Sequence, residues 1–185
     1  AAADVAREAD GESVVQVNEG DKMTQKEALQ AILIASANNI ARMLARWDAG
    51  SEEAFVKKMN DTAEELGMAD TTYTDPSGLR PETKSTAADQ VKLGAKAMED
   101  PLFREIVRQP NYTDSQGRRH DNWNRLVPYD GAVGIKTGTT TAAGGNLLFA
   151  AEKEVNGTTQ LIIGAVLSQR SSTSILDEVV ARSRD

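Results

Sequence analysis

The chain has 185 residues, a formal net charge of −7, no cysteine and one histidine, His120. This length suits one domain with a sizeable core, while mixed-sign charge without a basic stripe argues against nucleic-acid binding. The cysteine and histidine counts exclude a disulfide framework and a cysteine-based or histidine-rich metal site, and no apolar run reaches the roughly 18 residues that a membrane-spanning helix needs.

The first half of the chain predicts four helices. The first opens at Thr24, which forms a capping box with Glu27, so that a hydroxyl and a carboxylate satisfy the first free amides. The other helices have these boundary signals: Ser36-Ala37-Asn38 before the second, Ser51 and Gly67 around the third, Ser85 or Thr86 and about Met98 around the fourth, with a break at Asp100-Pro101. Residues at helical spacing are expected on the buried faces: Leu29, Ile32 and Leu33; Ile40, Met43, Leu44 and Trp47; Phe55, Met59, Thr62 and Leu66.

The second half changes to the two-residue period of strands. A small hairpin is predicted around Ser115-Gln116-Gly117, a short strand at 132–136, and two longer strands at 146–152 and 160–167 joined by the turn Asn156-Gly157. Nearer the ends, 13–17 alternates like a short strand and 1–10 predicts a helix or tail. A C-terminal helix on the sheet is predicted from Ile175, Leu176, Val179 and Val180. The pattern indicates an α+β fold in which helices pack on a mostly antiparallel sheet.

Two short motifs carry most of the chemical information. Ser36-Ala37-Asn38 lies between two predicted helices, and Lys136-Thr137-Gly138 lies at the end of an apolar run. Either motif alone is uninformative, because Ser and Asn favour helix caps and many strands end in such a turn. The pair is more informative, since one motif joins two helices and the other follows a strand.

The side chains of these motifs suit acyl transfer, which needs a proton shuttle, an anion anchor and donors for an oxyanion. Ser36 can pass a proton toward a leaving nitrogen, and Asn38 can hold a neighbouring lysine and the backbone of a substrate. Lys136 supplies positive charge that attracts a substrate carboxylate. The next positions complete the expected site: the hydroxyl of Thr137 for that carboxylate, the open space at Gly138 for substrate lying against the strand, and the backbone N–H of Thr139 for the oxyanion.

The nucleophile is missing from this set. A Ser-x-x-Lys pair would carry the nucleophile and its activating lysine, but no Ser or Thr stands three residues before any lysine of the chain. The residues at those positions are Glu19, Met23, Ala54, Phe55, Pro81, Asp89, Leu93, Val133 and Ala150. Any account of function must therefore explain a site without a visible nucleophile.

Over nearly its whole length the chain resembles the D-alanyl-D-alanine carboxypeptidases, the low-molecular-mass penicillin-binding proteins. The segments that carry the resemblance, in order, are 19–47, 55–68, Asp75-Pro76-Ser77-Gly78-Leu79, 85–89 and 131–146. The resemblance implies a mostly antiparallel sheet sandwiched by helices. It also implies no cofactor, and a site with Ser36, Asn38 and Lys136 as catalytic residues and Thr137, Gly138 and Thr139 as substrate-binding residues.

The function that the resemblance implies is removal of the terminal D-alanine of a peptidoglycan stem peptide through an acyl-enzyme on a serine. β-Lactams would acylate the same serine, and the protein would work outside the cytoplasmic membrane. Because the family's Ser-x-x-Lys lies on a helix N-terminal to the matched segments, residues 1–185 are expected to be a partial domain. Alone, this chain is expected to be inactive and to pair with a second copy or with a separate N-terminal chain that supplies Ser-x-x-Lys.

The chain departs from the family pattern in two places, and two other functions stay open. Ala37 stands where Gly is common, Thr139 stands where some members carry His, and Arg125 and Arg170 are alternatives for a basic residue near the carboxylate. One alternative is a non-catalytic module that binds peptidoglycan peptides or a partner protein. The other is a class A β-lactamase, which is disfavoured because no Glu-x-x-Leu-Asn segment lies between the motifs.

Four other polar or aromatic residues have simpler interpretations. Asp89 is expected to be a charge that favours the start of a helix, and His120 a solvated loop histidine. Trp123 and Asn124 resemble a segment near the cleft of the family, with ordinary packing as the alternative.

Overall fold

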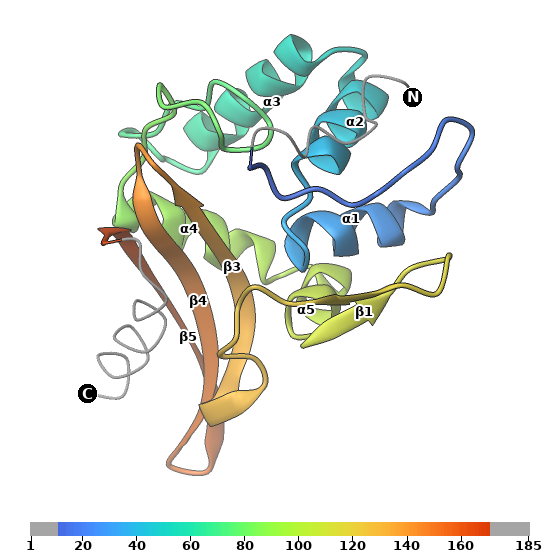
Figure 1. Cartoon of the computed structure of the whole chain (residues 1–185). Coiled ribbons are helices and arrows are strands. Elements are labelled where there is room, and N and C mark those ends of the chain that lie inside the picture. Colours follow the sequence, from blue (N-terminus) through green and yellow to red (C-terminus); the bar gives the residue numbers. More distant parts are fainter. Residues whose placement is uncertain (1–10, 171–185) are drawn as a thin grey trace.

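The computed structural model describes residues 11–170, in which a helical layer lies beside an antiparallel sheet (Figure 1). Helices α1 (Gln25–Leu33), α2 (Asn38–Ala49) and α3 (Glu52–Glu65) form the helical layer. Helix α4 (Ala87–Ala97) packs on strands β4 (Gly144–Val155) and β5 (Thr158–Gln169), and α5 (Pro101–Val107) connects α1 with strand β3 (Ala132–Thr140). The expected α+β class is confirmed. The helix or tail predicted at 1–10 and the helix predicted after residue 170 lie outside the described residues.

Side-chain caps explain where most of the helices begin. At each such cap an oxygen accepts a hydrogen bond from the N–H three residues later: Thr24 for α1, Ser51 for α3, Thr86 for α4 and Asp100 for α5. Three of these starts were predicted. Asp100-Pro101, predicted as a break, instead opens α5, because Asp caps a helix and Pro is tolerated in its first turn.

Three expectations about the helices were wrong. Trp47 was expected in the core but is 69% exposed, and Thr62 is exposed while its neighbour Ala63 is the buried residue of α3. Only half of the predicted capping box forms as expected, since the carboxylate of Glu27 accepts from the backbone N–H of Ser115 at 2.8 Å. The α1 start is therefore tied to the hairpin that follows α5 in the chain.

Within residues 11–170 the main sheet has the order β3–β4–β5, with antiparallel neighbours. Asn156-Gly157 joins β4 to β5 with positive φ at both residues, 53° and 77°, as the type I′ turn requires. Strand β3 runs to Thr140, beyond the predicted end at 136. Lys136-Thr137-Gly138 is therefore inside a strand and not after one, paired with 146–148 of β4.

Two buried apolar clusters hold these layers together. The first joins α1 and α2 to the hairpin, and its residues include Ile34, Ile40, Ile106 and Tyr112. The second lies between the sheet and helices α4 and α5, and its residues are Met98, Val107, Val133, Ile135 and Ala150. Leu33 packs against both clusters, so the end of α1 sits where the helical layer meets the sheet.

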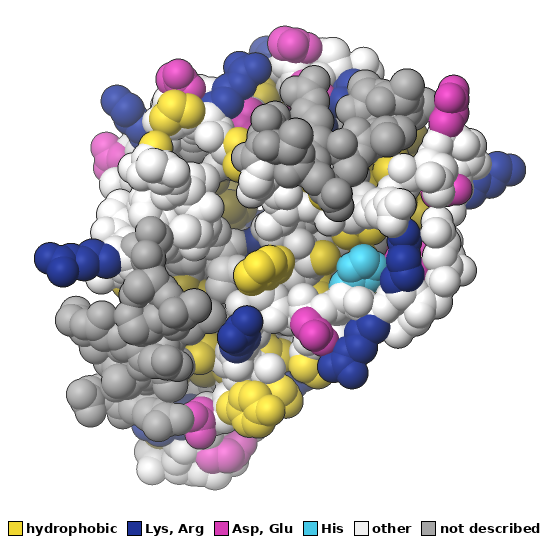
Figure 2. Space-filling model, in the orientation of Figure 1, with side chains coloured by type: hydrophobic (Ala, Val, Ile, Leu, Met, Phe, Trp, Pro, Cys, Tyr) yellow, Lys and Arg dark blue, Asp and Glu magenta, His cyan; other side chains and the backbone are white. Residues whose placement is uncertain are grey.

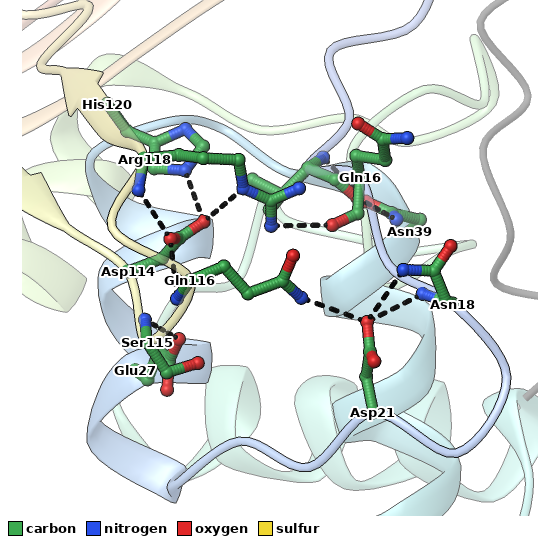
Figure 3. A network of polar contacts seen from close by, with 11 residues as sticks. Gln16, Asn18, Asp21, Glu27, Asn39, Asp114, Ser115, Gln116, Arg118 and His120 are labelled. Carbon is green, nitrogen blue, oxygen red and sulfur yellow. Dashed lines mark hydrogen bonds and ion pairs between the residues drawn. The ribbon is translucent and has the colours of Figure 1, made fainter.

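The segment at 13–17 was predicted as a strand but is not paired as one. Side chains hold it instead. The backbone N–H of Val15 donates to Asn39 Oδ1 at 3.2 Å, and Asn39 Nδ2 donates back to the Val15 carbonyl at 2.8 Å. Arg118 Nη2 donates to the Gln16 carbonyl at 2.8 Å (Figure 3). The buried amide of Asn39 and the partly exposed guanidinium of Arg118 thus replace a neighbouring strand.

His120 was expected in a solvated loop, and this expectation was wrong. It lies on strand β2 (Arg119–Asp121), which pairs with β1 (Asn111–Thr113), and its ring stacks on Tyr112 with centroids 4.9 Å apart. Its Nε2 is 3.0 Å from Asp114 Oδ2, which also accepts from Arg118 Nε at 2.7 Å (Figure 3). Burial would raise the pKa of Asp114, but the bonds from His120 and Arg118 outweigh it and hold the pKa well below its ordinary value.

On the face shown in Figure 2, cationic and anionic side chains are interspersed, and no continuous basic patch is visible (Figure 2). Among residues 11–170 no helix has both the length and the apolar character needed to cross a membrane.

Replacing Asn39 by Ala tests how the 13–17 segment is held. The buried N–H and carbonyl of Val15 lose their partners, so we expect the free energy of unfolding to fall by about 1–3 kcal/mol. Asn18→Ala is the matched control, since Asn18 bonds only in an exposed turn with Asp21 and should cost at most about 0.5 kcal/mol. Urea denaturation measures both. Equal stability of the two variants would contradict this account.

Candidate active site

Ser36 lies in the turn between α1 and α2 and has a left-handed backbone, with φ of 58°. A residue with a Cβ pays about 1–2 kcal/mol for this conformation. The turn is fixed on both sides by Ile34 and Ile40, which are fully buried. Packing therefore overcomes the strain and sets the direction of the Ser36 side chain.

Lys136 reaches Ser36 from strand β3. Its Nζ donates to Ser36 Oγ at 2.8 Å and to the carbonyl of Thr137 at 2.6 Å. These two residues are 100 positions apart in the chain. The structure thus brings together the predicted partners from the helical layer and the sheet.

Burial lowers the pKa of Lys136 to about 8, from an ordinary value of 10.5. At neutral pH an appreciable fraction of the side chain is then unprotonated. An amine in that state can accept a proton from the Ser36 hydroxyl, and the ammonium can return one. The pair Ser36–Lys136 is therefore chemically suited to move a proton in either direction.

Asn38 is the first residue of α2 and is 8% exposed. Its backbone N–H and its Nδ2 both donate to the carbonyl of Ser13, at 2.9 and 3.0 Å. A second contact holds the same segment, since Arg42 Nη2 lies 2.7 Å from a carboxylate oxygen of Glu12. The 11–13 segment is thereby fixed beside the Ser-x-Asn turn.

All six predicted site residues line one cleft of about 440 Å³: Ser36, Asn38, Lys136, Thr137, Gly138 and Thr139. Sequence reasoning missed two walls of this cleft, one formed by 11–13 and one by 76–79. The Asp75-Pro76-Ser77-Gly78 turn was recognised as a turn, but nothing in its sequence says which surface it faces. Trp123 also lines the cleft, as the resemblance suggested, and its Nε1 donates to the Ala35 carbonyl at 3.2 Å.

The basic residues considered for carboxylate binding lie elsewhere. Arg125 lines two other cavities and Arg170 is exposed after β5. Of the residues that the structure describes, Lys136 is the only cation lining the cleft. Asp89 is 2% exposed and accepts from the Asp70 N–H and the Thr71 hydroxyl. Asp89 lies in the first turn of α4, where a negative charge was expected, and it also ties the preceding loop to the helix.

A sequence model described as D-alanyl-D-alanine carboxypeptidase matches residues 1–169 of the chain. The chain belongs to this family. Carboxypeptidase DacF of Bacillus subtilis is 34% identical over 169 residues, which cover 84% of this chain and 41% of the relative. The chain thus spans less than half the length of this curated relative.

Solved structures of the family share the fold. The crystal structure of a Streptomyces DD-transpeptidase superposes with a TM-score of 0.83 at 27% identity, covering 95% of this chain and 72% of the other. A penicillin-binding protein from Listeria monocytogenes, in its ampicillin-bound form, gives a TM-score of 0.76 at 28% identity, covering 90% and 68%. The family resemblance drawn from the motifs is confirmed, and so is the expected fold.

The lowered pKa of Lys136 predicts a stability that depends on pH. Between about pH 8 and 10.5 the unfolded chain keeps a proton that the folded Lys136 has lost, so folding stability gains with rising pH in that window. We expect the native protein to gain stability relative to Lys136→Met from pH 8 to 10, measured by urea denaturation. Lys153→Met, at an exposed position of β4, controls for loss of a lysine. Parallel pH profiles for the native protein and Lys136→Met would refute the shift.

Proposed function

We propose that this chain forms the Ser-x-Asn and Lys-Thr-Gly half of a serine D-alanyl-D-alanine carboxypeptidase acting on peptidoglycan stem peptides. The observation that carries the proposal is the 2.8 Å hydrogen bond from Lys136 to Ser36, in a cleft that also holds Asn38. Family membership supports it. β-Lactams are the corresponding inhibitors, and the place of action is outside the cytoplasmic membrane, where this substrate occurs.

In this reaction a serine oxygen attacks the carbonyl carbon of the penultimate D-alanine. The oxygen passes its proton to the activating lysine of Ser-x-x-Lys, and the Ser36–Lys136 pair delivers a proton to the leaving nitrogen, so that D-alanine departs as an amine and an ester remains on the serine. Water then cleaves the ester and restores the serine. Lys136 and Thr137 hold the terminal carboxylate, Gly138 admits the peptide along β3, and Thr139 donates its N–H to the oxyanion.

The attacking serine must come from outside these 185 residues, since no Ser/Thr-x-x-Lys occurs within them. A groove of about 930 Å³ adjoins the cleft and shares the 11–13 segment and Trp123 with it. This groove is a suitable seat for a segment that carries Ser-x-x-Lys, supplied by the same protein or by a separate N-terminal chain. The same lack of a nucleophile favours the second candidate, a non-catalytic module that binds peptidoglycan peptides without turnover.

The 185-residue chain alone should form no covalent adduct with benzylpenicillin, because loss of the nucleophile of a serine acyl-enzyme costs on the order of 10⁶-fold in turnover. Intact-mass spectrometry after incubation measures this directly. A penicilloyl mass shift on the isolated chain would show that another residue serves as nucleophile.

Supplying the nucleophile should restore the reaction. We expect a fusion of this chain to the Ser-x-x-Lys segment of the Bacillus relative to form the adduct and to release D-alanine from a D-alanyl-D-alanine peptide. Lys136→Ala in the fusion should reduce release at least a hundredfold, whereas Lys153→Ala should not. Peptide binding without adduct or release in a folded fusion would favour the non-catalytic module.

A further inference from the structure

The 71–84 part of the loop between α3 and α4 has a carboxylate at its centre in place of an apolar core. Backbone hydrogen bonds of 2.8 and 2.9 Å between Thr72 and Lys84 close its base. Within residues 71–84, all of which the structure describes, Asp75 is the only buried residue, at 7% exposure. Asn60 holds the backbone of Tyr73 before the turn, so the shape of the turn after residue 75 depends on what Asp75 binds.

Asp75 gathers donors from the turn that follows it. Its Oδ2 accepts from the Ser77 hydroxyl at 2.6 Å, the Ser77 N–H at 3.1 Å and the Leu79 N–H at 3.0 Å. Its Oδ1 accepts from the Arg80 N–H at 3.3 Å. Burial acts to raise the pKa of Asp75, but these bonds outweigh it and lower the pKa below its ordinary value. The ionised carboxylate makes each bond charge-assisted, and such bonds are about twice as strong as neutral ones.

The turn that Asp75 holds is a wall of the cleft. Residues 76–79 line the same 440 Å³ cavity as Ser36 and Lys136, whereas Asp75 is not among its lining residues. Gly78, at the tip, has φ of 78° and is exposed. Asp75 can thus affect the cleft only through the turn, and without it the turn has no buried side chain to define its position.

We propose that Asp75 is a positioning residue for acyl transfer. By fixing residues 76–79 it sets the width of the cleft beside Lys136-Thr137-Gly138, and thereby the orientation of the peptide backbone bound there. This inference rests on the function proposed for the cleft. It assigns a reaction-related role to a carboxylate that touches neither the substrate nor the proton-shuttle residues.

Asp75→Asn is the informative substitution. It keeps the size of the side chain but replaces one accepting oxygen by an NH₂ group, which faces N–H or O–H donors and cannot accept from them. The turn therefore loses some of the hydrogen bonds that hold it. Asp61→Asn is the matched control, because Asp61 is exposed on α3 and pairs with Lys57. Ser77→Ala, which removes the hydroxyl donor and keeps the backbone donors, should have an intermediate effect.

Amide hydrogen exchange in the 185-residue chain tests the structural half of the proposal. We expect exchange at the amides of Ser77, Leu79 and Arg80 to be at least about tenfold faster in Asp75→Asn, with slow exchange retained in the core helices and no change in Asp61→Asn. Unchanged exchange at these three amides would overturn the proposal. Acceleration spread over the whole chain would overturn it as well, because Asp75 would then be a general stability residue.

Kinetics in the fusion that carries Ser-x-x-Lys test the catalytic half. Active sites are first counted by penicillin titration, so that misfolded protein does not lower the rate per site. We expect Asp75→Asn to reduce kcat/KM for the peptide by about tenfold to a hundredfold per titrated site, mainly through KM, and Asp61→Asn to leave it unchanged. An unchanged kcat/KM per site, with only fewer active sites, would overturn the positioning role. If the unsubstituted fusion is inactive, the proposed function fails and the positioning role fails with it, while hydrogen exchange still shows whether Asp75 holds the turn.

Discussion

The hydrogen bond between Lys136 and Ser36 joins the sheet to the helical layer, and the candidate site exists only where those two layers meet. A charged hydrogen bond contributes about 1.5–3 kcal/mol net, which is similar to the burial of a single isoleucine. Ile34, Ile40, Ile106 and Ile135 are all fully buried around this junction. Apolar packing, with several such side chains, therefore sets the distance between the layers, and the bond follows from it.

In the proposed function, this arrangement lets Lys136 serve two purposes. Its ammonium lies on β3 beside the hydroxyl of Thr137, the unobstructed backbone of Gly138 and the N–H of Thr139. Together these groups would attract the carboxylate of a substrate. With a pKa of about 8, roughly one molecule in ten is unprotonated at pH 7, and that form can take a proton from Ser36. Burial of Lys136 thus weakens its attraction for a substrate carboxylate and makes its amine better able to accept a proton.

Local signals in the sequence predicted much of the fold, and non-local contacts account for what they missed. Capping residues act over a few positions, so Thr24, Ser51 and Thr86 correctly predicted helix starts. The turn signal Asn156-Gly157 is equally local, and it correctly predicted the hairpin between β4 and β5. Trp47 was misplaced because Ala45, two positions earlier and so on the opposite side of α2, is the buried residue near that end. His120 was predicted to be solvated because its sequence neighbours do not reveal the strand pairing that places its ring on Tyr112. The site itself came from family resemblance, since spacing alone cannot bring residue 136 to residue 36.

The carboxylate interior of the 71–84 loop also bears on how this wall responds to temperature. Apolar clusters weaken on cooling, because the hydrophobic driving force fades as temperature falls. A loop organised by charge-assisted hydrogen bonds lacks that weakness, so this side of the cleft should keep its shape in the cold while the apolar junction behind it loosens. Acid is the condition to which it is vulnerable: the anchor is lost as pH falls through the depressed pKa of Asp75. The two sides of one cleft thus respond to different environmental stresses.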